Sequence, residues 1–225
     1  MKIGWVLIGV VGVILGLGCS SNTRTVRVAC APRVDLKSFP LIGLVTFDSN
    51  SNEGLDRLST QRFLQAVQAA QPGTRVVELG SEAQVLASVN RTAWDAQALA
   101  AVKAAHRVDV VVVGRFDVAR QRPNFEVSSW MKSLSAAANV DVKAELNCRL
   151  LETASGATVW AEGSSMTATL AHGSVGPHSG TIAASDPSAV YGKMVDELVW
   201  QVTDAFRVHY VTRRVPVDQV VASAD

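Results

Sequence analysis

Val108-Asp109-Val110-Val111-Val112-Val113-Gly114 is the strongest strand signal in the chain, because it is β-branched throughout apart from Asp109 and the closing glycine. A second apolar run, Leu41 to Phe47, follows Pro40 and precedes a loop rich in Asn and Ser. A continuous apolar run between turn signals predicts a strand that is buried on both faces. The two runs therefore predict the interior of a sheet.

The stretch from Val140 to Leu150 alternates almost without exception. Valine, alanine, leucine and Cys148 occupy one side, and charged or amide residues occupy the other. This period of two predicts a strand with one solvent-exposed face, which is typical of antiparallel sheets. Residues 152–156 predict a turn, and Ala157 to Ala168 predicts the hairpin partner.

Helices are predicted between and after the strands. Thr92 to Asp95 resembles a capping box, and Asp186-Pro187 is a strong start for the last helix. The predicted helices span about 54–71, 82–89, 93–106 and 187–209. The other expected segments are short strands at 25–31 and 74–79, a Gly/Ser-rich loop at 173–185 and a flexible tail at 211–225.

The first residues resemble an export signal. Lys2 is followed by an uncharged run and then by Gly16-Leu17-Gly18-Cys19, which resembles a lipobox although Gly16 stands where Leu is usual. We expect a signal peptide over 1–18, a lipidated tether from Cys19, and sorting to the outer membrane because Ser20 is not Asp. Cleaved soluble export and an uncleaved anchor remain alternatives, although a bilayer-spanning helix needs about 20 apolar residues.

Charge and cysteine content narrow the partner classes. With Lys2 removed, the 20 remaining basic residues balance the 20 acidic ones, and no basic patch stands out. This balance argues against a nucleic-acid partner. Cys30 and Cys148 lie on the apolar sides of their predicted strands, so a disulfide between them and two buried thiols both remain open.

The sequence shows no catalytic motif of the nucleophile-elbow, phosphate-loop or HExxH type. His172 and His178 flank a glycine-containing loop, but structural metal sites normally have closer ligand pairs, so exposed loop histidines are favoured. Asp48 ends a buried strand, where α/β folds place functional groups, and an Asx turn or helix cap is the simpler interpretation. We predict no enzyme activity, no cofactor and no metal; a hydrolase or metal-dependent enzyme around His172 and His178 is the opposing hypothesis.

Two tryptophans are candidates for a protein interface. Trp200 projects from the last predicted helix on the side opposite the apolar stripe, among charged residues. Trp130 lies in a predicted loop. Tryptophan is enriched at binding hot spots, although the tail or a loop covering these side chains is the alternative.

Four local signatures occur in a set order in this chain. They are Leu44-Val45-Thr46-Phe47-Asp48, Thr74-Arg75-Val76-Val77-Glu78, Val108-Asp109 leading to Val113-Gly114, and Leu150-Leu151-Glu152-Thr153-Ala154-Ser155-Gly156-Ala157-Thr158-Val159-Trp160-Ala161. Together with the lipobox they resemble the CsgG-like family of periplasmic lipoproteins. That family includes the curli secretion channel, the LpoB-type activators of peptidoglycan synthases and the related N-terminal domain of TolB.

The resemblance covers most of residues 41–210 and implies an α/β sandwich with a mixed, largely antiparallel sheet flanked by helices. It implies a non-enzymatic, lipid-anchored protein of the outer membrane that faces the periplasm and binds another envelope protein or itself. The alternative is a subunit of an oligomeric secretion pore. In the channel member two stretches form membrane hairpins; here they correspond to 118–138 and 163–184, which we expect to be loops because their alternation is brief.

Overall fold

The computed structural model describes residues 23–51, 54–120, 124–130, 133–175, 180–184 and 186–216. The chain divides into two compact units. The larger, which we call the α/β domain, spans Ala31–His209, and the smaller combines Met1–Cys30 with Tyr210–Asp225. The α/β domain thus begins before the predicted Leu41, because Val34 N donates to Ala205 O at 3.1 Å and Leu36 is buried in the core.

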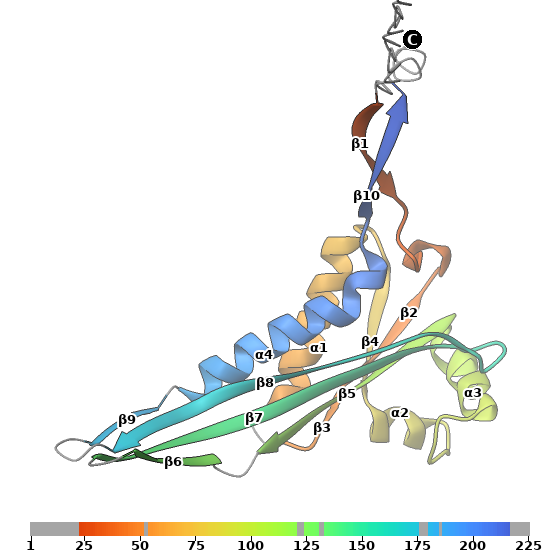
Figure 1. Ribbon diagram of the computed structural model, residues 1–225. Coiled ribbons are helices and arrows are strands. Elements are labelled where there is room, and N and C mark those ends of the chain that lie inside the picture. Colours follow the sequence, from red (N-terminus) through yellow and green to blue (C-terminus); the bar gives the residue numbers. More distant parts are fainter. Residues whose placement is uncertain are drawn as a thin grey trace, which may run out of the picture. The chain divides into compact units, whose positions relative to one another are not determined.

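Within the described residues the sheet of the α/β domain has eight strands, in the order β4-β2-β5-β7-β8-β9, with β3 paired to β5 and β6 paired to β7 (Figure 1). Pairings among β2, β3, β4 and β5 are parallel, and those from β5 to β9 are antiparallel. The predicted mixed, largely antiparallel α/β fold is confirmed. The strands are β2 (Ile42–Thr46), β3 (Asp48–Ser49), β4 (Val76–Ser81), β5 (Val110–Arg120), β6 (Asn124–Trp130), β7 (Ser133–Glu152), β8 (Thr158–Val175) and β9 (Gly180–Ala184).

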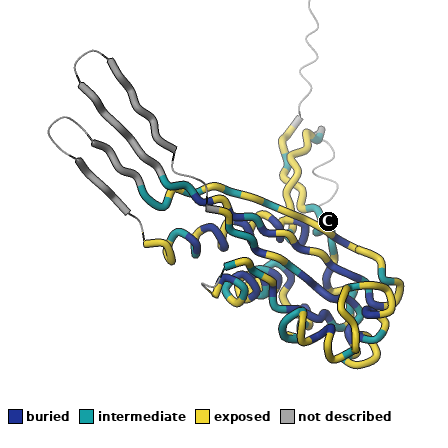
Figure 2. The backbone as a smooth tube through the Cα atoms, turned by 90° about the horizontal axis from the view of Figure 1, so that it is seen from below, coloured by how far each residue is buried: buried dark blue, intermediate teal, exposed yellow. Residues whose placement is uncertain are grey.

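Helices cover the two faces of this sheet unequally. On one face, α1 (Leu55–Ala70) and α4 (Pro187–Val202) bury the apolar side of β5, β7 and β8 in the larger core, which includes Phe63, Leu146 and Leu198. On the other face, a smaller core joins α2 (Glu82–Ser88) and α3 (Ala96–His106) to Val45, Val111 and Val113. Figure 2 shows the resulting buried band along the middle of the domain.

The local start signals explain where the helices begin. Ser81 caps α2 in a reciprocal capping box with Gln84, and Asp186 caps α4 with Pro187 in the first turn. The third helix begins later than predicted, because Asp95 and not Thr92 accepts the backbone N–H of Ala98, at 2.6 Å. The last α-helix ends at Val202 and continues as a 3₁₀ turn, η2 (Thr203–Phe206), instead of reaching His209.

The expectation of loops at 118–138 and 163–184 is wrong for the described residues. β6 pairs with β7 from Asn124↔Asn139 to Trp130↔Ser133, and β9 pairs with β8 from Ala171↔Ala184 to Val175↔Gly180. Alanine and serine have weak intrinsic strand preference, so the sequence underestimates strands whose pairing with neighbours decides their conformation. Both stretches are therefore continuations of the sheet.

The smaller unit contains a two-stranded sheet, which we call the terminal ribbon. It joins β1 (Thr23–Cys30) to β10 (His209–Pro216), so the predicted flexible tail is wrong as far as Pro216. The β-branched residues of β10 favour a strand, but its partner strand, β1, lies near the opposite end of the sequence. Cys19 and residues 217–225 lie outside the described residues. No helix in the described part of the chain has the length and apolar character needed to cross a membrane.

Both described cysteines carry free thiols, so the disulfide that the sequence left open is not formed in this structure. Cys148 is 1 % exposed, and burial raises the pKa of its thiol. Because the thiolate is the reactive form, we expect alkylating reagents to modify half-buried Cys30 in the folded protein and to reach Cys148 only after denaturation. Mass spectrometry of the labelled peptides measures this difference, and equal labelling of both peptides in the native protein would contradict it.

Candidate functional site

One face of the sheet remains open where β7 and β8 extend beyond α2. We define the open sheet face by its exposed or half-buried residues, which alternate with the core positions of the same strands. The predicted solvent-exposed side of β7 is thereby confirmed. The members of the open sheet face are Arg115 and Asp117 of β5, Lys143, Glu145, Asn147 and Arg149 of β7, and Ala161, Gly163 and Ser165 of β8.

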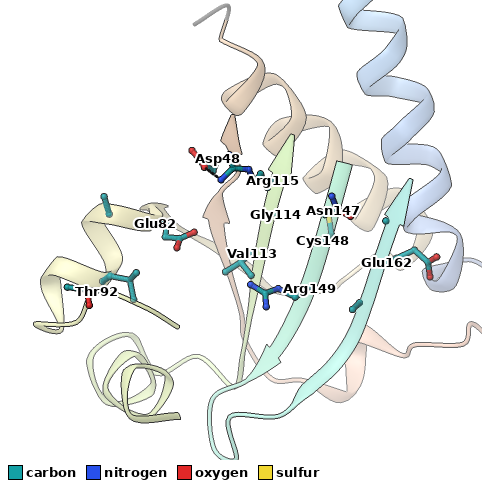
Figure 3. A pocket seen from close by; sticks show the side chains of 14 residues that line it. Asp48, Glu82, Thr92, Val113, Gly114, Arg115, Asn147, Cys148, Arg149 and Glu162 are labelled. Atoms are coloured by element: carbon teal, nitrogen blue, oxygen red, sulfur yellow. Dashed lines mark hydrogen bonds and ion pairs between the residues drawn. The ribbon is translucent and has the colours of Figure 1, made fainter. Parts of the chain in front are cut away.

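A concavity of about 900 Å³ lies at one end of the open sheet face. Its floor includes Val113, Arg149 and Gly163, and α2 forms a wall from which Glu82 points towards the sheet (Figure 3). Gly163 lies beside the exposed side chain of Asn147, whose Oδ1 would have to move to make room for a Cβ atom at this position. The concavity is thus lined by both charged and apolar side chains, which come from α2 and several strands.

Asp48, the first residue of β3, lines this concavity, and its carboxylate caps none of the described helices. Arg115 Nη1 lies 3.0 Å from Asp48 Oδ2 (Figure 3). Arg115 Nε also donates to Asp117 at 2.8 Å. The hydrogen bond and charge of Asp117, followed by the charge of Asp48, raise the pKa of the Arg115 guanidinium. The predicted cap is absent because the N-cap position of α1 is Gly54, which has a left-handed backbone and no side chain to accept a hydrogen bond.

Trp200 provides a second surface, on the last α-helix. Its side chain is 59 % exposed, which makes it one of the largest apolar groups presented to solvent by the described residues. The guanidinium carbon of Arg207 lies 3.2 Å from the centre of the indole ring, a close cation–π contact. The ring is therefore supported on one side and accessible on the other.

Arg207 is itself fixed in place. It donates to Thr203 Oγ1 at 2.8 Å and to the carbonyl of Trp200, and it forms an ion pair with Asp204 at 3.7 Å. Burial lowers the pKa of its guanidinium, and the charge of Asp204 opposes that shift. Asp204 also pairs with Arg33 at 3.0 Å, so the surface around Trp200, which we call the Trp200 surface, is held by a small charged network.

For four other predicted site residues, the structure describes no side chain. Cys19 and His178 are not among the described residues, and only the backbone is described for Trp130, at the end of β6, and for His172 in β8. Within the described residues, no group of three or more His, Cys, Asp or Glu side chains is placed to hold a metal ion. Among the sequence-predicted residues whose side chains are described, Asp48 and Cys148 both line the concavity.

One group of positively charged residues is not predicted from the sequence. β1 contributes Arg24 and Arg27 to the terminal ribbon, and β10 contributes Arg213 and Arg214. The whole-chain balance of charge conceals this group, because the two strands lie near opposite ends of the sequence. The pairing of β1 with β10 therefore brings four arginines into one two-stranded sheet. The local sequence signal for this group is the pair Arg213-Arg214.

No protein-family model matches the chain, and no curated protein matches it either. Solved structures with similar folds include the PelC dodecamer from Paraburkholderia phytofirmans, at 9% identity and a TM-score of 0.38, covering 83% of this chain and 99% of that one. Lipoprotein GNA1162 from Neisseria meningitidis is 18% identical, with a TM-score of 0.30 and coverage of 72% and 97%. The LpoB C-terminal domain from Salmonella enterica is 10% identical, with a TM-score of 0.31 and coverage of 56% and 81%. Bacterial lipoproteins are thus among the solved structures that this chain resembles in fold.

Proposed function

We propose that this protein is a lipid-anchored component of the bacterial outer membrane that faces the periplasm and acts by binding another envelope protein or a second copy of itself. The observation that carries this proposal is Trp200, a large aromatic side chain that is 59 % exposed on a rigid helix. Aromatic side chains held in place before binding lose little conformational freedom when a partner covers them. The proposal retains the resemblance to CsgG-like lipoproteins as its family-level expectation.

The anchoring part of the proposal rests on the sequence Gly16-Leu17-Gly18-Cys19. Two or three acyl chains on Cys19 would hold the domain on a bilayer, because each buried CH₂ contributes about 0.8 kcal/mol. Mass spectrometry of the mature N-terminal peptide tests it. We expect a chain that begins at acylated Cys19; an unmodified Cys19, or a chain that still carries Met1, would refute the anchoring.

The binding part rests on the Trp200 surface. Trp200 is 59 % exposed, and the guanidinium of Arg207 packs against its ring while it pairs with Asp204. An exposed tryptophan supported by an arginine has the composition of a binding hot spot, in which a few residues contribute most of the affinity. A partner with an apolar pocket for the indole would complement this surface.

We expect Trp200→Ala to weaken association by about 2 kcal/mol or more, roughly a 30-fold increase in Kd, because the indole would contribute a large share of the buried apolar area. The stability of the domain should change little, since the side chain is mostly exposed. Gln61→Ala, at an exposed position on α1, is the control and should bind normally. The measurement is a binding titration with the partner recovered by crosslinking, or sedimentation if the protein binds itself; equal Kd values for both variants would contradict the hypothesis.

A second candidate is a subunit of an oligomeric secretion pore. It is favoured by one observation, that β6 to β9 are paired strands in the two stretches that correspond to the membrane hairpins of the channel. Against it, β6 has 7 residues and β9 has 5, whereas a membrane strand needs about 9–11. Stepwise conductance of purified protein in planar bilayers would favour the pore, and silent bilayers would favour the binding protein.

A further inference from the structure

We propose that the terminal ribbon lies on the membrane surface and binds the phosphate groups of anionic phospholipids. This inference deepens the proposed function, because it relies on the anchoring of Cys19 to bring the ribbon to a bilayer. Three independent features of the described ribbon carry it: its charge, the arrangement of its faces and its distance along the chain from the anchor.

The first feature is charge. The described residues of β1 and β10 include four arginines and no aspartate or glutamate. In contrast, the described arginines of the α/β domain include several that pair with carboxylates, such as Arg33, Arg62 and Arg115. A positive segment without internal counter-charge is complementary to a layer of phosphates, and guanidinium groups bind phosphate oxygens in bidentate geometry.

The second feature is the arrangement of the ribbon's two faces. Arg27 lies over the ring of Tyr210, with 5.5 Å between the guanidinium carbon and the ring centre, so these two residues share one face. Because side chains alternate along a strand, Arg24 and Val28 of β1 and Val211 and Arg213 of β10 belong to the opposite face.

This second face, which we call the valine face, combines two arginines with two exposed valines. Val28 is 37 % exposed and Val211 is 40 % exposed. Apolar residues beside basic ones are the composition of segments that lie at the boundary between lipid headgroups and acyl chains. A two-stranded sheet is also marginally stable by itself in water, so a surface that covers the valine face would stabilise the ribbon.

The third feature is the short distance to the anchor. Three residues separate Cys19 from Thr23, where β1 begins, so four steps of the chain join them. A fully extended chain spans at most about 3.6 Å per residue, so the start of β1 lies within roughly 15 Å of an acylated Cys19. Electrostatic attraction to a charged bilayer acts over a Debye length of about 8 Å at physiological salt. A tether this short keeps the start of β1 close to the bilayer and allows the arginines of the ribbon to reach the headgroups, where the attraction acts.

A vesicle-binding experiment separates this inference from the anchoring itself. The mature chain, Cys19–Asp225, is produced without the signal segment so that Cys19 carries no acyl group, and is sedimented with two kinds of vesicle. One contains phosphatidylcholine alone, and the other also contains phosphatidylglycerol. We expect preferential binding to the phosphatidylglycerol vesicles, weakening as salt is added. Equal binding to both vesicles, or none to either, would overturn the inference, whereas the mass of the natural N-terminus tests the anchor independently.

Charge-reversal variants locate the binding. Arg24→Glu with Arg213→Glu should lower the partition coefficient by about tenfold or more, because each basic residue near the surface contributes several-fold. The matched control is Arg57→Glu with Arg75→Glu, which changes the net charge equally at exposed positions of the α/β domain. Arg24→Lys with Arg213→Lys keeps the charge and should keep most of the binding, which excludes unfolding of the ribbon as the cause. An equal loss in the control pair, or a full loss in the lysine pair, would overturn the inference.

Discussion

Gln71→Leu is expected to lower the free energy of unfolding by about 3–5 kcal/mol, because one buried amide satisfies three backbone groups. Gln71 is 4 % exposed. Its Oε1 accepts the N–H of Leu36 at 2.9 Å, and its Nε2 donates to the carbonyls of Val34 at 2.7 Å and Phe206 at 3.0 Å. Leucine has a similar size but leaves these groups without their partner.

Gln71 also connects two distant segments of the chain. Gln71 joins the segment that enters the α/β domain to the segment that leaves it, since Val34 and Phe206 lie close to opposite ends of this unit in the sequence. Urea unfolding monitored by tryptophan fluorescence measures the effect. Gln68→Leu, at an exposed position on the same helix, is the matched control and should change stability by less than about 0.5 kcal/mol. Similar losses in both variants would show that the hydrogen bonds of Gln71 are not the cause.

Gly114→Ala is expected to destabilise the protein by about 2–3 kcal/mol through overpacking. A Cβ atom at Gly114 would lie 2.6–2.8 Å from three ring atoms of Phe47. Phe47 is 1 % exposed and makes an edge contact with Phe63, with ring centres 5.2 Å apart, so it has little room to move. The clash therefore has to be relieved by shifting the sheet or the core.

A second glycine provides a control, because its replacement is expected to change the stability in the opposite direction. Gly192 lies inside α4 with no atom within 4 Å of its would-be Cβ, so Gly192→Ala should stabilise the protein by up to about 1 kcal/mol through helix propensity. Thermal or urea unfolding of both variants measures the contrast. Adding Phe47→Leu to Gly114→Ala should cost less than the sum of the two single changes, because the smaller side chain removes the clash. Strict additivity would contradict the proposed contact.

Much of the fold follows from local chemistry that the sequence displays. The alternation from Val140 to Leu150 predicts β7 because one face is buried and the other is not, and the structure shows this burial pattern. Ser81 and Asp186 predict helix starts because their side-chain oxygens satisfy backbone N–H groups that a helix leaves unpaired, at Gln84 and Ser188. Signals of this kind need no knowledge of distant residues.

The rest depends on contacts between distant parts of the chain. β10 is a strand because it pairs with β1, and β9 is a strand because it pairs with β8. Neither pairing can be read from the residues of the strand itself. The same limit applies to the candidate sites. Trp200 was predicted as a surface residue from the helical wheel, but its support by Arg207 depends on the 3₁₀ turn that follows α4. The four arginines of the terminal ribbon became visible as one group only through the β1–β10 pairing.

The central claim is that this protein acts through contacts made by the Trp200 surface while it is anchored in the envelope. The most direct test introduces a photo-crosslinking amino acid at position 200 in living cells, with position 61 as the exposed control on α1. We predict discrete adducts with a protein, or with a second copy of this chain, at position 200 and none of these at position 61. An absence of adducts at position 200, or the same adducts at both positions, would contradict the claim.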